Sequence, residues 1–172
     1  MTSAEFILAL VTLQRAAELV VSSRNTSTLR ARGAFEVAPR HYPFVVAVHA
    51  GWLISLWIFG HDQPLNGFVS ELLIYLALQG FRLWVMWTLG ARWTTRIIIL
   101  PGEPLVAAGP YRLLQHPNYA VVAGEIAILP LVLGLPWLAL IFTAVNATVL
   151  FIRIRAENQA LAAARTMLVR GA

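Results

Sequence analysis

Residues 118–153 read NYAVVAGEIAILPLVLGLPWLALIFTAVNATVLFIR. They form two apolar runs, 118–134 and 136–153, with only Gly134-Leu135-Pro136 at the junction. Glycine and proline are typical of the end of one helix and the start of the next. Because so short a connection forces the second helix back along the first, the pattern predicts a tight antiparallel hairpin of two helices.

Three further apolar segments precede this hairpin, at roughly 3–22, 43–60 and 67–89. Of the 172 residues, 59% are hydrophobic and 12% charged, whereas a soluble domain has about 25% charged residues. This composition excludes soluble globular, disordered and disulfide-scaffold proteins. A helix that crosses a bilayer needs about 20 apolar residues. The sequence therefore predicts an all-α integral membrane protein with about five transmembrane helices and a single domain over 1–172.

The basic residues are distributed unevenly between the connections. All 13 are arginine, and 11 of them gather in segments 23–41 and 90–117 and in the tail from Arg153 onward. Connections 60–66 and 134–136 hold none. Cytoplasmic loops carry the excess of arginine. We therefore expect both long loops and the C-terminus in the cytoplasm and the N-terminus outside. The arginines form no dense patch, so we expect the lipid bilayer and not nucleic acid as a partner.

The loop over 92–109 reads differently from the helices. Arg96–Leu100 is short and rich in β-branched residues, and Pro101–Pro104 is a turn signal. Leu105–Ala107 could then form a second strand that pairs with the first. This pattern predicts a short cytoplasmic β-hairpin or an extended flap. Its apolar strands need a surface to cover, either the membrane interface or a bound ligand.

Several polar residues lie within the apolar spans, where an ionisable group costs about 2.5–3.5 kcal/mol and calls for a partner or a function. Arg15 and Glu18 are three residues apart and are expected to pair on one helix face. His49 is expected to be a hydrogen-bonded structural residue. Arg82 has two interpretations, because its side chain either snorkels to the cytoplasmic end or binds an anionic ligand group.

The predicted hairpin carries two polar stripes. Asn118 and Glu125 are seven residues apart, and Arg153 and Glu157 are four apart, so each pair shares a helix face. Antiparallel packing allows these stripes to face each other near the cytoplasmic end. An ion pair between Arg153 and Glu157 would explain those two residues as structural, but it does not explain Glu125 inside the apolar run.

His116 stands immediately before this hairpin. Pro117 disfavours helix at His116, which places the histidine just outside the helix and the proline in its first turn. An exposed histidine beside free amide donors at a helix N-terminus makes a binding edge. A turn with an interfacial histidine of structural role is the alternative for this segment alone.

Four elements of the second half of the chain form one motif: Gly109-Pro110-Tyr111-Arg112, His116-Pro117-Asn118-Tyr119, Glu125, and the tail 153–161, RIRAENQAL. This motif resembles that of the isoprenylcysteine carboxyl methyltransferase family, whose members are integral-membrane methyltransferases. The resemblance covers about 80–165, the half expected to bind the cofactor. It implies S-adenosylmethionine as cofactor. Similarity of the first half to short bacterial members implies a bacterial inner (plasma) membrane protein.

Two positions depart from the family pattern. The family usually has arginine before His-Pro, where this chain has Gln115, and it often has Glu-Glu in the tail, where this chain has Glu157-Asn158. Both departures remove a charge near the expected cofactor. The amide of Asn158 is still able to hydrogen-bond a ribose or amino-acid group.

The resemblance also implies roles for individual residues. Glu157 is suited to accept from ribose hydroxyls, and Arg153 or Arg112 to pair with the cofactor carboxylate. Arg82 and Glu125 would lie deeper, near the acceptor. The residues expected to line the cofactor cleft are His116, Tyr119, Glu157 and Asn158.

Methyl transfer from a sulfonium needs no metal and no protein nucleophile, which suits a chain with no cysteine and no metal-ligand cluster in its sequence. If the acceptor is a phenol or enol, Glu125 or His116 would serve as the base. A carboxylate acceptor needs no base, and an arginine would hold it instead.

The predicted function is therefore S-adenosylmethionine-dependent O-methylation of a lipophilic small molecule at the cytoplasmic interface. The resemblance points to an alkylpyrone-like or a prenylcysteine-like acceptor, with a carboxylate or an enol as the reacting group. Two alternatives remain open at this point: an NADPH-dependent membrane reductase of the sterol reductase kind, and a small membrane protein without enzymatic activity.

Overall fold

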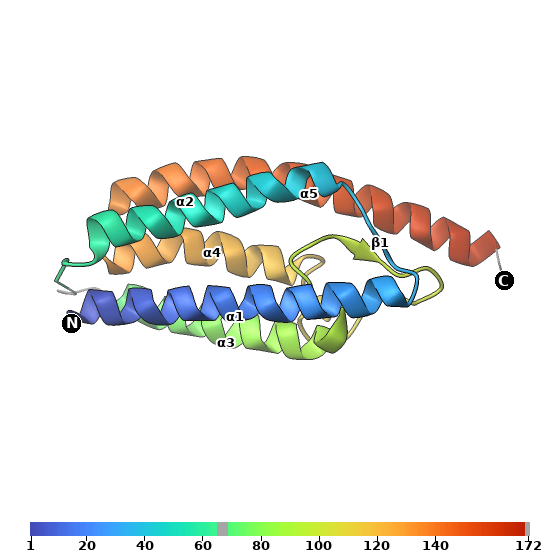
Figure 1. The fold of residues 1–172 in the computed structure, drawn as a ribbon, viewed down its shortest axis with the longest axis horizontal. Coiled ribbons are helices and arrows are strands. Elements are labelled where there is room, and N and C mark those ends of the chain that lie inside the picture. Colours follow the sequence, from blue (N-terminus) through green and yellow to red (C-terminus); the bar gives the residue numbers. More distant parts are fainter. Residues whose placement is uncertain (65–68, 171–172) are drawn as a thin grey trace.

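A computed structural model describes residues 1–64 and 69–170 of the chain, with side chains described up to residue 162. Five long helices lie along the long axis and alternate in direction (Figure 1). Short 3-10 turns and a two-stranded sheet connect them at one end. The elements are α1 (Ser3–Ala31), β1 (Phe35–Glu36), η1 (Pro39–His41), α2 (Tyr42–Gly60), α3 (Val69–Leu89), η2 (Gly90–Arg92), β2 (Ile98–Ile99), η3 (Gly109–Arg112), α4 (Pro117–Val132) and α5 (Pro136–Arg170).

The predicted all-α membrane architecture is confirmed. Four of the helices, α1, α2, α3 and α5, are long and apolar enough to cross a membrane. Helix α4 has 16 residues and is a shorter apolar helix, about 24 Å long at 1.5 Å per residue. Helices α1 and α5 continue well past the ends predicted for them, and the first two residues of the predicted span 67–89 lie outside the described residues.

The predicted helical hairpin at the C-terminal end of the chain is also present. Helices α4 and α5 pack against each other, and Gly134 makes the turn between them with φ of +70°, a conformation that glycine adopts without strain. The backbone N–H of Leu135 donates to the carbonyl of Pro130 at 2.8 Å, which satisfies one of the open carbonyls at the end of α4.

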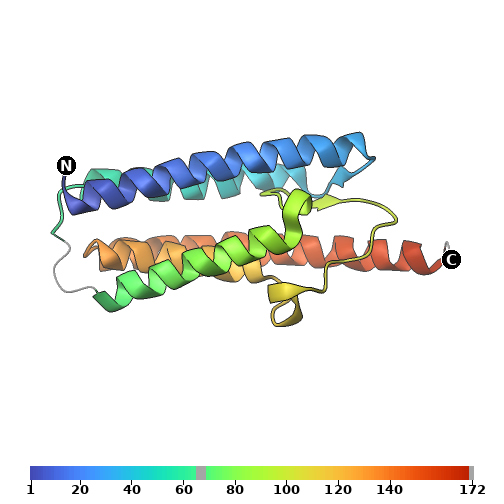
Figure 2. The same cartoon turned by 90° about the horizontal axis from the view of Figure 1, so that it is seen from below.

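The connections separate into two groups at opposite ends of the bundle. The N-terminus and the α4–α5 turn lie at one end, and the sheet and the C-terminus lie at the other (Figure 2). The arginine-rich segments are thus gathered at a single end, as the predicted topology requires. The cytoplasmic assignment of that end stays a prediction.

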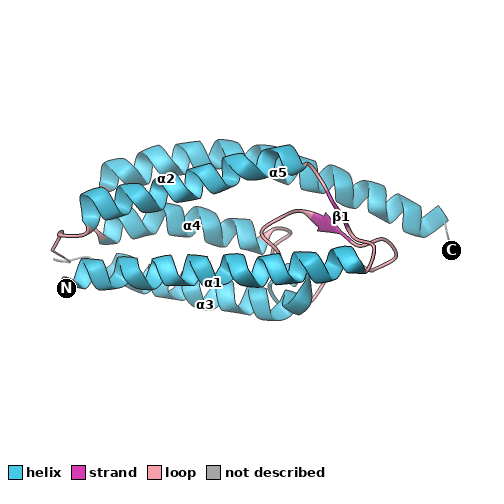
Figure 3. Cartoon of the chain, in the orientation of Figure 1, coloured by secondary structure: helices cyan, strands magenta, loops and turns pink. Residues whose placement is uncertain are grey.

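The loop over 92–109 forms a strand, but its partner differs from the predicted one. Strand β2 pairs antiparallel with β1, with Phe35 opposite Ile99 and Glu36 opposite Ile98, so the sheet joins two loops that are distant in sequence (Figure 3). Residues 105–107, the expected partner, are not in a strand. An ion pair of 2.7 Å between Glu36 and Arg96 strengthens the pairing that is observed.

The apolar core lies toward the end of the bundle that holds the N-terminus. Leu8 of α1, Leu56 of α2 and Leu129 of α4 are fully buried there and belong to one cluster. Burial of such side chains stabilises a fold by about 1.5–3 kcal/mol each relative to water. With the core at one end, the polar residues of the bundle are left in its middle and at the arginine-rich end.

We expect Gly109→Ala to destabilise the protein more than Gly102→Ala. Both glycines have positive φ, +52° and +80°, so alanine is strained by about 1–2 kcal/mol at either position. A Cβ on Gly102 meets nothing within 4 Å, whereas one on Gly109 would lie 2.5 Å from Thr88 Oγ1 and 3.2 Å from Trp84 Nε1. Thermal unfolding in a neutral detergent measures the difference, and equal losses for the two variants would contradict it.

Candidate functional site

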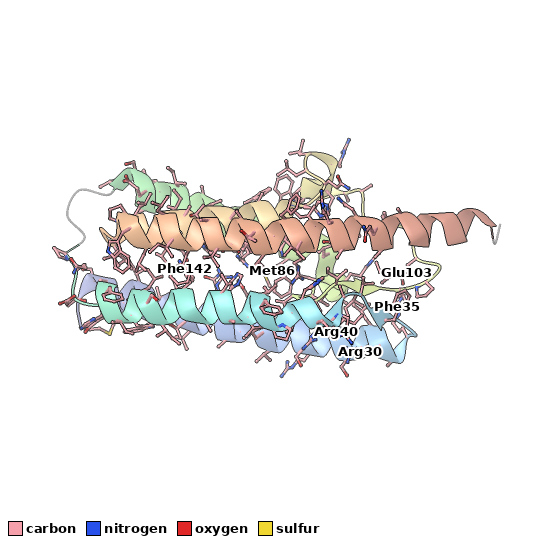
Figure 4. All side chains as sticks on the ribbon, turned by 90° about the horizontal axis from the view of Figure 1, so that it is seen from above. Arg30, Phe35, Arg40, Met86, Glu103 and Phe142 are labelled. Carbon is pink, nitrogen blue, oxygen red and sulfur yellow. The ribbon has the colours of Figure 1, made fainter. Side chains whose placement is uncertain are left out.

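A cavity of about 330 Å³ opens at the arginine-rich end, within the range of about 300–1,000 Å³ typical of ligand pockets. Its walls come from the end of α3, the loop over 92–107, the first turn of α4 and α5. Glu103, which lines it, is labelled at this end in Figure 4. Four of its lining residues were predicted to bind a cofactor: His116, Tyr119, Arg153 and Glu157.

Tyr119 lies at the centre of this group. Arg153 Nε donates to the Tyr119 hydroxyl at 2.8 Å, and that hydroxyl donates to Glu157 Oε2 at 2.5 Å. The polar stripes of α4 and α5 therefore face each other, as predicted. The direct ion pair expected between Arg153 and Glu157 is not formed among the described residues, because the tyrosine hydroxyl lies between them and satisfies both.

His116 is held by Asn158 and by Tyr119. His116 Nε2 lies 2.9 Å from Asn158 Oδ1, an acceptor, so Nε2 carries the hydrogen in this arrangement. The imidazole stacks on the Tyr119 ring with centroids 5.4 Å apart. His116 Nδ1 then lies 3.6 Å from Glu157 Oε2, which places an ionisable nitrogen at the wall of the cavity beside a carboxylate.

Gln115 and Asn158, the two residues that depart from the family pattern, contact each other. Gln115 Nε2 donates to Asn158 Oδ1 at 3.1 Å. Where the family pattern has a basic and an acidic residue at these positions, this chain has two neutral amides that satisfy each other. The loss of both charges therefore leaves neither partner unpaired at this edge of the cavity.

Two polar atoms in the cavity wall have no partner among the described residues. Trp93 Nε1 and Asn118 Oδ1 are buried and unpaired, and both residues line the cavity. A buried polar atom without a hydrogen bond costs about 1–3 kcal/mol, so such atoms call for an explanation. They leave one donor and one acceptor unpaired in residues that line the cavity. Sequence reasoning missed Trp93, because the sequence does not show whether a buried indole N–H has a hydrogen-bond partner.

Tyr111, which belongs to the quoted family motif, also lines the cavity. Burial, together with the negative charge of Glu157, raises the pKa of Tyr111 to about 12. The phenol is therefore protonated at neutral pH and remains a hydrogen-bond donor. Arg112, the next residue, is exposed and is not one of the described residues that line the cavity. Of the two arginines predicted to pair with a cofactor carboxylate, the structure brings only Arg153 to the site.

Arg82 and Glu125, predicted near the acceptor, lie in a separate buried network between α1, α3 and α4. Arg82 is 2% exposed, so the prediction that it snorkels is wrong. Its Nε donates to Glu125 Oε1 at 2.8 Å and its Nη1 to Glu18 Oε2 at 3.1 Å. Arg15 donates to Glu18 and to Glu125, at 2.9 Å in each case. The predicted Arg15–Glu18 pair is thus confirmed.

The charges in this network balance, although Arg15 Nε is buried without a hydrogen-bond partner among the described residues. Two arginines balance two glutamates, and Gln79 adds a hydrogen bond of 2.7 Å to Glu125. Neither Arg82 nor Glu125 is among the described residues that line the cavity. His49, as expected, is held structurally, with Nδ1 at 2.8 Å from the carbonyl of Val45.

Fold and site together define a small helical membrane protein with a cavity at one end that polar residues help to line. Comparison with known proteins supplies the family. A model of the isoprenylcysteine carboxyl methyltransferase (ICMT) family matches residues 71–163, more than half of the chain and the part that contains most of the cavity wall. The chain therefore belongs to this family, and membership implies a methyltransferase of the membrane.

Two bacterial relatives are similar over most of their length. "Uncharacterized protein YpbQ" of Bacillus subtilis is 37% identical over 158 residues, covering 90% of this chain and 94% of that protein. An "Uncharacterized protein" of Haemophilus influenzae is 27% identical over 148 residues, covering 83% of this chain and 86% of the relative. No solved structure matches the chain significantly.

Proposed function

We propose that this protein is an S-adenosylmethionine-dependent O-methyltransferase that acts on a lipophilic acceptor at the cytoplasmic face of the membrane. The observation that carries the proposal is the cavity at the arginine-rich end, where His116, Tyr119, Arg153 and Glu157 converge. A polar cofactor and an apolar acceptor can meet only at such an interface, because the cofactor is supplied from water and the acceptor from lipid.

The cavity wall suits the polar parts of the cofactor. Glu157 Oε2 holds Tyr119, which leaves Oε1 to accept from ribose hydroxyls. Arg153 carries a positive charge for the amino-acid carboxylate. The unpaired atoms Trp93 Nε1 and Asn118 Oδ1 would complete their hydrogen bonds with the nucleoside part.

When bound, the cofactor supplies an activated methyl group on a sulfonium. The task of the protein is then to position the two reactants and to exclude water. His116 is the candidate base for an enol or phenol acceptor, because its imidazole lines the cavity. Glu125 and Arg82 are buried in mutual ion pairs, so we propose that they act as positioning residues, through the placement of the helices that carry them.

The acceptor that we propose is an alkylpyrone-like or prenylcysteine-like lipid. The support is the family resemblance together with the location of the cavity at the end of long apolar helices, where a lipid tail remains in the bilayer while its polar end reaches the site. We further propose that the arginine-rich end faces the cytoplasm of a bacterial cell, in accordance with the positive-inside rule.

Calorimetric titration of the detergent-purified protein tests the proposal. We expect saturable binding of S-adenosylhomocysteine and none of NADPH. Glu157→Gln keeps the side-chain shape but removes the charge, and a hydrogen bond to a charged group contributes about 1.5–3 kcal/mol. The variant should therefore bind about tenfold or more weakly. Glu71→Gln, at the first turn of α3 at the opposite end, is the matched control and should bind as the wild type does.

Other results would overturn the proposal in different ways. Binding of NADPH without S-adenosylhomocysteine would indicate a membrane reductase. Binding of neither by a folded sample would favour a protein without enzymatic activity. Equal weakening by Glu157→Gln and Glu71→Gln would show that the cofactor analogue does not bind through Glu157 in the cavity.

A further inference from the structure

A second cavity, of about 380 Å³, lies beside the last three turns of α1. Apart from Leu19, the residues that line it are polar: Ser22, Ser23, Thr26, Ser27, Arg30, Tyr42 and Arg96. Most of them stand on one side of α1, spaced three or four residues apart. They lie almost entirely outside the part of the chain that the family model matches, and only Arg96, through its ion pair with Glu36, has been given a role above.

Thr26, which lines the cavity, has a hydroxyl group without a hydrogen-bond partner in the described part of the chain. Thr26 is 7% exposed, and its hydroxyl Oγ1 is buried without a hydrogen-bond partner among the described residues. A threonine inside a helix usually donates to the carbonyl four residues earlier. Thr12 and Thr28 of the same helix do so, at 2.7 Å and 3.1 Å. Thr26 does not, so its donor is left unpaired in a residue that lines the cavity.

The charges that line the cavity favour an anion. Arg30 and Arg96 share one carboxylate, with Glu36 Oε2 at 2.5 Å from Arg30 and Oε1 at 2.7 Å from Arg96. Two positive charges against one negative leave a net positive charge. The Arg96 guanidinium also lies 3.9 Å from the centroid of the Tyr42 ring, a contact that holds it in place.

Two carbonyl groups in the last turn of α1 are satisfied by the loop that follows it. The N–H groups of Arg32 and Ala34 donate to Leu29 and that of Gly33 donates to Arg30, each at 3.0 Å. Because the negative end of a helix dipole acts mainly through unpaired carbonyls, this pairing reduces the repulsion that an anion meets there.

The two cavities are neighbours. Arg96 lines both of them. Thr95, on the same loop, contacts Ser22 Oγ at 2.8 Å and the Tyr42 hydroxyl at 3.1 Å on one side, and its carbonyl accepts from Arg153 on the other. A single loop segment thus separates them.

We propose that the second cavity binds an oxyanion group, phosphate or carboxylate, carried by a lipophilic molecule. Thr26 donates a hydrogen bond to the oxyanion, and Arg30 and Arg96 balance its charge. The cavity lies at the arginine-rich end of a membrane helix, where the polar ends of lipids gather. Two sources fit this chemistry: a phospholipid headgroup, and the polar end of a methyl acceptor that reaches Arg96 from the lipid side. The oxyanion site itself does not depend on the proposed methyl transfer.

Binding of three single-chain probes to the full-length protein in a neutral maltoside detergent tests this site. Dodecyl phosphate and dodecanoate carry the two oxyanions, and dodecanol is the uncharged control for partition into the micelle. We expect saturable binding of at least one anionic probe and none of dodecanol. Thr26→Val should weaken that binding about tenfold, whereas Thr28→Val, the matched threonine two residues away, should leave it unchanged.

A second pair of variants keeps the test independent of any single substitution. Arg30→Gln should weaken binding of the anionic probe, and Arg32→Gln should not, although both arginines are about half exposed, 51% and 50%, and each pairs with a glutamate. Thr26→Val replaces an unpaired buried hydroxyl by a methyl group of similar size, so it should fold at least as stably as the wild type.

The outcomes separate the two sources. Tighter binding of dodecyl phosphate supports the oxyanion site and assigns it to a lipid headgroup. Tighter binding of dodecanoate supports it and assigns it to a carboxylate-bearing acceptor. Dodecanol binding as tightly as the anions, or equal effects of Thr26→Val and Thr28→Val, would overturn the proposal, because attraction to surface arginines or to the micelle would then explain the binding.

Discussion

Glu125→Gln is expected to lower the free energy of unfolding by about 3–5 kcal/mol, the usual effect of removing one partner from a buried ion pair. Glu125 is 2% exposed and accepts from Arg15, Gln79 and Arg82. Without its charge, the buried Arg82 and the partly buried Arg15 share the single carboxylate of Glu18. Unfolding of the purified protein by increasing dodecyl sulfate in mixed micelles measures the loss.

A double variant distinguishes two reasons for the loss of stability in Glu125→Gln. Either an arginine is left without its partner, or the fold requires the carboxylate itself. Arg82→Met with Glu125→Leu removes one arginine and one glutamate and leaves Arg15 paired with Glu18 at 2.9 Å. Apolar residues of similar volume often replace a buried pair without loss of stability. We therefore expect the double variant to recover most of the stability that Glu125→Gln loses. A double variant as unstable as the single one would contradict the account of the network.

The same double variant tests the predicted role of these two residues in the reaction. If it folds and binds S-adenosylhomocysteine but no longer transfers a methyl group, Arg82 and Glu125 are required for catalysis. If transfer persists, their part is in holding α1, α3 and α4 together.

Arg153→Met is expected to weaken binding of S-adenosylhomocysteine by about tenfold or more, because hydrogen bonds from a charged group contribute about 1.5–3 kcal/mol each. Arg153 is 7% exposed. Its Nε holds the Tyr119 hydroxyl at 2.8 Å, and its Nη2 donates to the carbonyl of Thr95. The substitution therefore loosens two walls of the cavity and removes the positive charge proposed to pair with the cofactor carboxylate.

Arg155→Met is the matched control on the same helix. Arg155 is exposed, and its guanidinium lies 4.3 Å from the centroid of the Phe151 ring, away from the cavity. Both variants lose one arginine from the same end of α5, so they change the net charge equally. Calorimetry should show a weakened Arg153→Met and an unchanged Arg155→Met. Equal weakening would attribute the effect to net charge and not to the cavity.

Contacts within one helix or one turn were predictable. The Arg15–Glu18 pair follows from a spacing of three residues, which brings two side chains together on any helix. The hairpin follows from Gly134 and Pro136, because the turn is local. The number of long helices follows from the length of the apolar runs, and it needed no knowledge of how they pack.

For contacts between helices, the sequence predicted which helix faces meet but not which residues on those faces contact each other. The stripes of α4 and α5 were expected to meet, and they do, but the partners within them depend on the rotation and height of each helix. That geometry places the Tyr119 hydroxyl between Arg153 and Glu157. The same reasoning explains why the sequence did not predict Glu125 as the partner of Arg82. Arg82 is on α3 and Glu125 is on α4, and these two helices pack against each other.

Sequence reasoning found the residues of the cavities whose side chains have recognisable chemistry. It missed the residues whose polar atoms lack a hydrogen-bond partner. His116, Tyr119, Arg153 and Glu157 line the cavity, and the resemblance had singled them out. Trp93 and Thr26 matter because their polar atoms are unpaired. Whether a buried donor has a partner depends on every element around it, and no pattern along the chain reports it.

Composition and spacing were enough to establish a polytopic helical membrane protein, its alternating topology and the family motif of its second half. Those properties depend on hydrophobicity along the chain and on contacts between residues close in sequence. Only the folded structure could establish the pairing of β1 with β2, the charge-balanced network around Glu125 and the two neighbouring cavities. Each joins segments distant in sequence, and small helix rotations decide which of several suitable partners meet.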